Sequence, residues 1–227
     1  MSDTEAVKRI GFITGIQKEA AILRKNSGIQ KSDVKCAGAN SDRANELASD
    51  LAQDGCDALI SFGVAGALDP TLRPGDLIIP DQVISTNGDS FETSKDQLIS
   101  HLGSRFIFKR GSLLGSDNLI ASVTEKQALH KSTGSIAVDM ESIGVAQAAR
   151  GHGLPFLVIR AISDAADQDL PAASYQAVDD QGNIRIGSIL LELVKNPSGL
   201  PDLIKMSGDS GKAFDTLRRV AALVIDY

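Results

Sequence analysis

The stretch that most constrains how this chain folds runs from Val138 to Gln168. Val138 to Glu141 open a predicted helix, glycines and a proline end it, and the apolar run Phe156–Ile162 follows, as expected of a strand covered on both faces. A helix packed on a sheet starts where the preceding strand ends, and the next parallel strand returns to that edge. We therefore expect Glu141 and Asp164 to meet at the carboxyl edge of one sheet, where open α/β folds bind ligands.

The rest of the chain alternates between strand and helix patterns. We predict strands at 10–15, 34–38, 58–62, 76–84 and 111–116, and helices at 17–24, 42–53, 94–102, 124–130, 187–195 and 212–225. Such alternation is typical of an α/β fold with a largely parallel or mixed sheet. A length of 227 residues fits one domain, so we expect a single domain over 1–227 with a C-terminal helical extension from about residue 187.

Composition excludes several classes of function. The net charge of −6 gives no reason to expect nucleic acid as a partner, because a phosphate backbone needs a basic face. Cys36 and Cys56 do not form a disulfide framework, and a reduced cytosolic interior is the better interpretation. The N-terminus is polar and acidic, unlike a signal peptide, and no apolar run approaches the roughly 20 residues that cross a bilayer. We expect a cytoplasmic protein with no transmembrane segment.

Motifs outside the stretch from Val138 to Gln168 give weaker signals of function. Glu19 follows the first predicted strand, where it either complements a helix dipole or belongs to a site. The glycines of 63–66 directly after a strand permit close approach of a ligand or of a packed element. Arg160 needs an acidic partner if it is buried. The three histidines share no ligand spacing, and no Gly-x-Ser-x-Gly elbow is present, so we expect no metal site and no serine triad.

These motifs, taken in order, resemble the nucleoside phosphorylase/nucleosidase superfamily. The resemblance rests on Gly11-x-x-x-Gly15-x-x-x-Glu19, Gly63-Val-Ala-Gly66, Arg73-Pro-Gly-Asp76, Val138-Asp-Met-Glu141 and Arg160-Ala-Ile-Ser-Asp164. It is strongest with the methylthioadenosine/S-adenosylhomocysteine nucleosidase branch. It implies a three-layer α/β/α sandwich around a central mixed, barrel-like sheet, and a homo-oligomer with the active site near a subunit contact.

The resemblance also implies roles for individual residues. Asp164 matches the acid that protonates the purine at N7, and Glu19 matches the acid that positions the attacking water. Met140 and Glu141 match the residues that contact the ribose. The resemblance also implies that the backbone at Leu119 and Ile120 reads the adenine edge. It implies further substrate contacts from the glycine-containing loop, at Gly63, Val64 and Ala65. Breaking an N-glycosidic bond generates an oxocarbenium-like sugar and a poor leaving group, so paired acids suit this chemistry.

One departure concerns phosphate. Phosphorylases of the superfamily clamp phosphate partly with an Arg and a Ser in the loop that here reads Ser61-Phe-Gly-Val64. A doubly charged anion is poorly held without that clamp, so hydrolysis is favoured over phosphorolysis. Arg43 remains a possible substitute phosphate ligand, and phosphate would be a co-substrate only in a phosphorylase. We expect no other cofactor.

A second resemblance concerns the 5′ substituent of the nucleoside. The residues after Gln168, with Val178-Asp-Asp-Gln-Gly182 and Asn196-Pro-Ser-Gly-Leu-Pro201, resemble the hopanoid-associated branch, which removes adenine from adenosylhopane. It implies a lipid-linked adenine nucleoside as the substrate and transient contact with the inner membrane surface. The open alternatives are a methylthioadenosine/S-adenosylhomocysteine nucleosidase, a purine nucleoside phosphorylase and a non-catalytic nucleoside-binding protein.

Overall fold

Strand β3 (Ala58–Ala67) is the centre of the sheet, because three other strands pair with it. The computed structural model describes residues 9–26, 28–94, 104–171, 178–179, 181–185 and 200–224. Strand β10 (Phe156–Asp164) runs parallel to β3 along one edge. On the other edge, β1 (Ile10–Thr14) pairs in parallel with the first half of β3, and β9 (Ala137–Asp139) pairs antiparallel with its last residues.

The remaining strands extend this mixed sheet on both sides. Strand β9 continues to β8 (Ser112–Gly115), β5 (Gln82–Ser85) and β6 (Ser90–Glu92), while β10 continues to β4 (Leu77–Ile78) and β7 (Phe108–Lys109). Strand β2 (Val34–Cys36) pairs with β1.

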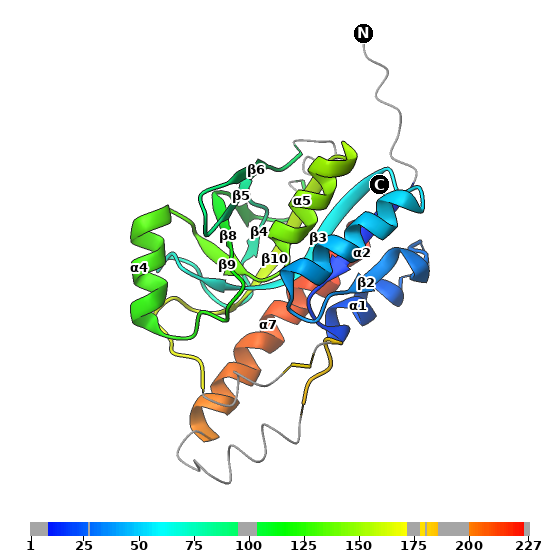
Figure 1. Cartoon of the computed structure of the whole chain (residues 1–227). Coiled ribbons are helices and arrows are strands. Elements are labelled where there is room, and N and C mark those ends of the chain that lie inside the picture. The colour runs from blue at the N-terminus through cyan, green and yellow to red at the C-terminus, as the bar shows by residue number, and fades with distance from the viewer. Residues whose placement is uncertain are drawn as a thin grey trace.

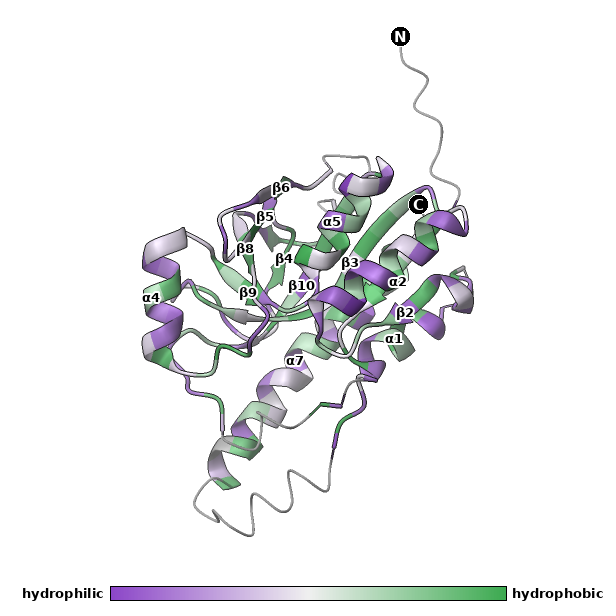
Figure 2. Cartoon of the chain, viewed as in Figure 1, coloured by the Kyte–Doolittle hydropathy of each residue, from purple (hydrophilic) through white to green (hydrophobic). Residues whose placement is uncertain are grey.

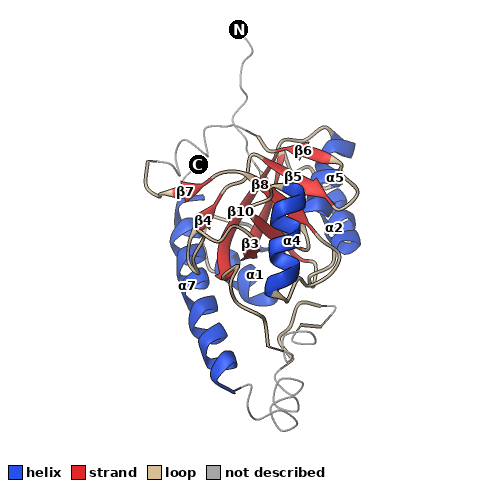
Figure 3. Cartoon of the chain, turned by 90° about the vertical axis from the view of Figure 1, so that its left-hand side faces the viewer, coloured by secondary structure: helices blue, strands red, loops and turns tan. Residues whose placement is uncertain are grey.

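Helices cover both faces of the sheet, which confirms the expected layered α/β fold with a central mixed sheet (Figure 1). Helices α2 (Ser41–Gln53) and α5 (Ser142–His152) cover one face, and α1 (Gln17–Arg24) and α7 (Leu200–Val224) cover the other. Helix α4 (Val123–Thr133) lies at one side of the sheet, in front of it in Figure 3. A short 3-10 turn at Lys31–Asp33 connects α1 to β2.

The sequence pattern explains the two cores between these layers. Adjacent strand residues point to opposite faces. Ile13 and Leu59 therefore join the cluster beneath α2 and α5, while their neighbours Phe12 and Ile60 join the cluster beneath α1 and α7. Apolar residues follow the central strands in Figure 2, and polar residues lie on the outer surfaces of the helices.

Several expected boundaries were wrong. Strand β3 does not stop at Phe62 but continues through the glycine-containing residues, because β10 and β9 pair with them. The expected strand at 76–84 is broken around Pro80 into β4 and β5, which pair with different neighbours. Helix α7 begins at Leu200, well before the expected start at 212. The helices expected at 94–102 and 187–195 fall on residues outside the described ranges, apart from Ser94.

The stretch from Val138 to Gln168 has a different topology from the one expected. Because β9 is antiparallel to β3 and β10 is parallel to it, β9 and β10 run in opposite directions. Val138 and Asp164 instead flank the same residue of β3, Gly66, from its two edges. Glu141, which follows β9, and Asp164, at the end of β10, therefore meet across β3. Within the described residues, no helix is long and apolar enough to cross a bilayer.

Candidate active site

A cavity of about 220 Å³ lies where β3 and β10 end, beside the turn between β1 and α1. It is bounded by segments that are far apart in sequence, including the loop before α4 and the junction of β9 with α5. Its lining residues are Gly15, Ile16, Glu19, Ala39, Val64, Ala65, Gly66, Asn118, Leu119, Ile120, Val138, Asp139, Met140, Glu141, Ser163, Asp164, Leu170 and Val178. All three expected acids are therefore brought to one cavity.

Glu19 is held rigidly at the first turn of α1. Its Oε2 accepts hydrogen bonds from the backbone N–H groups of Gly15 and Ile16, both at 2.9 Å, and its Oε1 accepts one from Val64 at 2.8 Å. The side chain thus caps the first turn of α1, where the structural alternative expected an acid that complements the helix dipole, and it also lines the cavity. Burial raises the pKa of Glu19, while Arg160 and the three backbone donors act in the opposite direction. A carboxylate tuned in this way suits general-base chemistry.

Arg160 carries the positive charge beneath the cavity. It is fully buried on β10, and its Nε donates to Asp139 Oδ2 at 2.7 Å. Its Nη2 donates to Ser61 Oγ at 2.7 Å and lies 3.4 Å from Glu141 Oε2. The expected acidic partner of Arg160 is therefore Asp139, and Ser142 Oγ also donates to this carboxylate. Ser61, at the position where the resemblance implied an arginine in phosphorylases, is engaged by this network.

Glu141 shares the cavity with two other buried acids. Burial raises its pKa to about 8, with Asp139 and Glu19 adding to the rise and Arg160 opposing it. At neutral pH this carboxyl group therefore holds a proton for most of the time. A protonated carboxyl group both donates and accepts a hydrogen bond, as contact with sugar hydroxyls requires.

Asp164 ends β10 on the opposite side of the cavity. Its Oδ1 accepts a hydrogen bond of 2.7 Å from Ser163 Oγ. Its Oδ2 accepts one of 2.6 Å from Nζ of Lys126, a fully buried residue of α4. Sequence reasoning missed Lys126, since a lysine within a polar helix is ordinarily solvent-exposed. The available signal was its spacing from Val123 and Leu129, which places it on the inward face of α4.

The outer wall of the cavity is apolar. Ile16, Leu119, Leu170 and Val178 contribute to it, and Val178 forms an isolated bridge with Ile184. The backbone of Gln17 donates to Gly182 O at 2.9 Å, which fixes this segment against the start of α1. Leu119 is 36% exposed and Ile184 is 45% exposed. Apolar surface therefore continues from the cavity to solvent.

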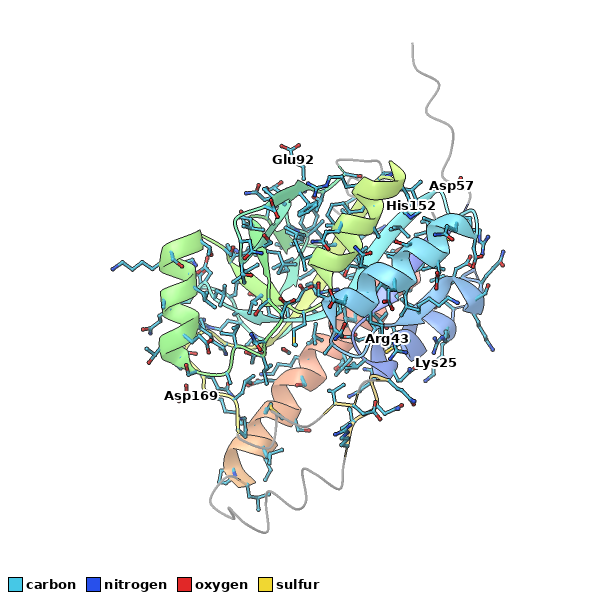
Figure 4. The ribbon with its side chains drawn as sticks, viewed as in Figure 1. Lys25, Arg43, Asp57, Glu92, His152 and Asp169 are labelled. Atoms are coloured by element: carbon cyan, nitrogen blue, oxygen red, sulfur yellow. The ribbon has the colours of Figure 1, made fainter. Side chains whose placement is uncertain are left out.

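Most of the expected substrate-contacting residues line the cavity, namely Val64, Ala65, Leu119, Ile120, Met140 and Glu141. Gly63 does not line it and instead leaves room for the Glu19 side chain. Arg43 lies in the first turn of α2 and is also absent from the lining (Figure 4). Among the described residues, no group of three or more His, Cys, Asp and Glu residues could hold a metal ion.

Several acids line one cavity, with the buried cations Lys126 and Arg160 beside them and with Glu141 protonated. This arrangement defines an enzyme site suited to glycosidic bond cleavage. Comparison with known proteins supports this class. The model of the family described as "Phosphorylase superfamily" matches residues 11–195 of this chain. The chain therefore belongs to the phosphorylase superfamily.

Individual relatives agree with that assignment. The 5′-methylthioadenosine/S-adenosylhomocysteine nucleosidase of Staphylococcus aureus (strain bovine RF122 / ET3-1) is 30% identical over 184 residues, which cover 71% of this chain and 76% of the relative. The expectation that the chain is an enzyme is thereby confirmed.

Solved structures support the fold. The nucleosidase of the same name from Neisseria meningitidis, in complex with methylthio-immucillin-A, gives a TM-score of 0.71 at 18% identity, covering 97% of this chain and 100% of that one. Futalosine hydrolase of Helicobacter pylori strain 26695 gives a TM-score of 0.65 at 20% identity, covering 83% and 98%.

Proposed function

We propose that this enzyme hydrolyses the N-glycosidic bond of an adenine nucleoside that carries a large apolar 5′ substituent, most specifically adenosylhopane, releasing adenine and ribosylhopane. The observation that carries the proposal is a single cavity with Glu19, Glu141 and Asp164 on its inner surface and an apolar outer wall. The nucleosidase relatives support the cleavage of an adenine nucleoside.

In the proposed reaction each acid has one task. Asp164 gives a proton to N7 of the base, which offsets the charge on the leaving group. Glu141 and the neighbouring Met140 hold the ribose, where hydrogen bonds strengthen as positive charge develops on the sugar. Glu19 orients a water molecule for attack at C1′ and takes its proton. These steps require no cofactor.

The buried polar network favours water over phosphate as the attacking group. Ser61 Oγ is bonded to Arg160, and the Arg160 side chain is occupied by Asp139, so neither is free to clamp a doubly charged anion.

The size of the cavity bears on the 5′ substituent. Pockets that enclose drug-sized ligands are typically roughly 300–1,000 Å³. A cavity of about 220 Å³ is smaller, so a polycyclic substituent would extend past the outer wall onto the exposed side chains of Leu119 and Ile184. We propose that delivery of such a lipid-linked substrate involves transient contact with the inner membrane surface.

A methylthioadenosine/S-adenosylhomocysteine nucleosidase is the second candidate, favoured by the names of the relatives. Adenine release from adenosylhopane, methylthioadenosine and S-adenosylhomocysteine, with and without phosphate, separates the candidates. We expect kcat/KM to be highest for adenosylhopane and independent of phosphate. Faster turnover of methylthioadenosine would refute the hopanoid substrate, and strict dependence on phosphate would refute hydrolysis.

The assignment of the acid has its own test. Asp164→Asn removes the proton donor without changing the shape of the side chain, so adenine release should fall by about 10²–10⁴-fold. Unchanged release would show that another group protonates the base. Asp167→Asn is the matched control, because Asp167 is an exposed acid of the same turn.

A further inference from the structure

Lys126 is the only fully buried lysine among the described residues, and it contacts the proposed proton donor. Its Nζ donates to Asp164 Oδ2 at 2.6 Å, to Ala165 O at 2.9 Å and to Gln168 O at 2.9 Å. An ammonium group has three N–H donors, and all three are used here. The geometry therefore describes a charged lysine that reaches the cavity from behind Asp164.

The two buried cations of the site serve different acids. Arg160 contacts Asp139 and Glu141, on the sugar side of the cavity, whereas Asp164 is the one carboxylate among the described residues that Lys126 contacts. Ser163 holds the other oxygen of Asp164, so the orientation of this carboxyl group is fixed at both oxygens. Burying an ammonium group is costly, and an apolar residue would fill the same space without that cost.

We propose, on the basis of the function proposed above, that Lys126 is a positioning residue that supplies the proton which Asp164 delivers to the base. A proton moves from Lys126 Nζ to Oδ2 of the Asp164 carboxylate along their hydrogen bond, and the carboxyl group formed in this way gives that proton to N7. The bond between C1′ and N9 breaks, and its electron pair leaves with adenine. Water adds to C1′ and loses its proton to Glu19, and that proton returns to the lysine through solvent once the products leave.

The arrangement of α4 is consistent with this role. The helix begins where Val123 N–H donates to Asp169 Oδ1 at 2.6 Å, and Asp169 lies beside the lower end of α4 in Figure 4. Leu170 N–H donates to Ala121 O at 2.8 Å. The turn after β10 is thus tied to the start of α4 by contacts that do not involve Lys126, and anchoring this turn does not require a buried charge.

The test compares two leaving groups attached to the same 5′-substituted ribose. Adenine needs a proton to leave, whereas 4-nitrophenolate leaves readily as an anion. With Lys126→Met, we expect kcat for adenine release to fall by about 10²-fold or more, the range of one lost proton transfer, and kcat for nitrophenolate release to change less than about threefold. Lys126→Arg keeps the positive charge but cannot release a proton, so adenine release should fall as strongly as it does in Lys126→Met. Lys131→Met, at an exposed position of α4, should change neither reaction.

Three results would overturn the inference. The first is an equal loss on both leaving groups, which indicates a purely structural lysine. The second is unchanged adenine release. The third is a double variant Lys126→Met/Asp164→Asn that loses the product of the two single losses, because residues that act as one unit lose little more together than the worse one alone.

Folding and function are kept separate in this design. If Lys126→Met does not fold, Lys126→Gln retains donors for the two carbonyl groups and takes its place. If neither folds, Lys126→Arg decides, because it keeps the charge and the hydrogen-bond donors but cannot release a proton. A loss confined to adenine release supports the relay, and full adenine activity refutes it. Absence of adenine release by the wild-type enzyme would refute the proposed function itself.

Discussion

A Cβ atom at Gly63 would lie 2.7 Å from Oε1 of Glu19, so the missing side chain at residue 63 is what allows the acid to occupy its position. Gly63 belongs to β3 and pairs with Arg160 of β10. Glu19 is thus clamped between a glycine of the central strand and three backbone donors. Its position depends on β3 as much as on α1.

Replacing this glycine tests that dependence. Gly63→Ala should displace the Glu19 carboxyl group and lower kcat by about 10²-fold, since misplacing a reacting group by about 1 Å has such an effect. Steady-state assays of adenine release provide the measurement. Gly151→Ala is the control, because nothing lies within 4 Å of its added Cβ; it should leave kcat unchanged and stabilise α5 by about 0.5–1 kcal/mol. Full activity in Gly63→Ala would show that Glu19 tolerates displacement.

The ion pair beneath the cavity should dominate stability. Asp139→Asn leaves the buried Arg160 without its main charged partner, and breaking a buried pair in this way costs about 3–5 kcal/mol. Urea unfolding measures the change. Asp81→Asn breaks the exposed pair of Asp81 with Arg110 and should cost less than about 1 kcal/mol. Similar losses at the two sites would contradict the burial of the Arg160 network.

Glu141 should make stability depend on pH. Its pKa is raised from 4.5 to about 8 in the folded chain, so the folded state holds a proton that the unfolded state releases between these values. The resulting stabilisation is complete below about pH 4.5 and is lost as pH rises toward 8, with a slope of up to about 1.4 kcal/mol per pH unit. Glu141→Gln removes this contribution.

The unfolding free energy of the wild-type protein should therefore fall relative to that of Glu141→Gln as the pH rises from 5 to 8. Parallel pH profiles for the two proteins would mean that Glu141 is ionised in the folded state. Because Asp139 and Glu19 interact with Glu141, the comparison reports the titration of this group of acids together.

The outer wall can be loosened without touching the acids. Gly182 has φ of +81°, and an added Cβ would collide with Cys36 Sγ and lie 2.9 Å from Gly15 O. Gly182→Ala should therefore detach the segment from α1, raising KM for nucleosides with large 5′ groups severalfold while changing kcat little. A fall in kcat with unchanged KM would show instead that this segment acts on the reacting atoms. Gly88→Ala, also at positive φ but with open space around it, controls for backbone strain.

The sequence indicated the catalytic acids better than it indicated the path of the chain between them. Glu19, Glu141 and Asp164 each lie at the end of a strand or the start of a helix, and such junctions are visible in local patterns. The direction of β9 is not visible, because whether a short strand runs parallel or antiparallel depends on its neighbour in space. The expected meeting of Glu141 and Asp164 was therefore correct for a wrong topological reason.

Lys126 and Asp139 illustrate a second limit. Both are charged residues in sequence contexts that suit a solvent-exposed position. Elements distant in the chain bury them: the turn after β10 covers Lys126, and Arg160 covers Asp139. Gly63 was expected to contact the substrate, but it instead leaves room for the side chain of Glu19 on α1. Tertiary contacts, which no local pattern encodes, decide these positions.

The segment that carries Val178 and Gly182 has a consequence for how such enzymes diversify. Val178 lines the cavity, yet the segment supplies none of the three acids, and its own contribution to the attachment on α1 is main-chain carbonyl groups, to which the backbone and the side chain of Gln17 donate. Insertions or replacements there can be inherited without loss of bond cleavage. Substrate range can therefore drift quickly in a lineage whose chemistry stays constant.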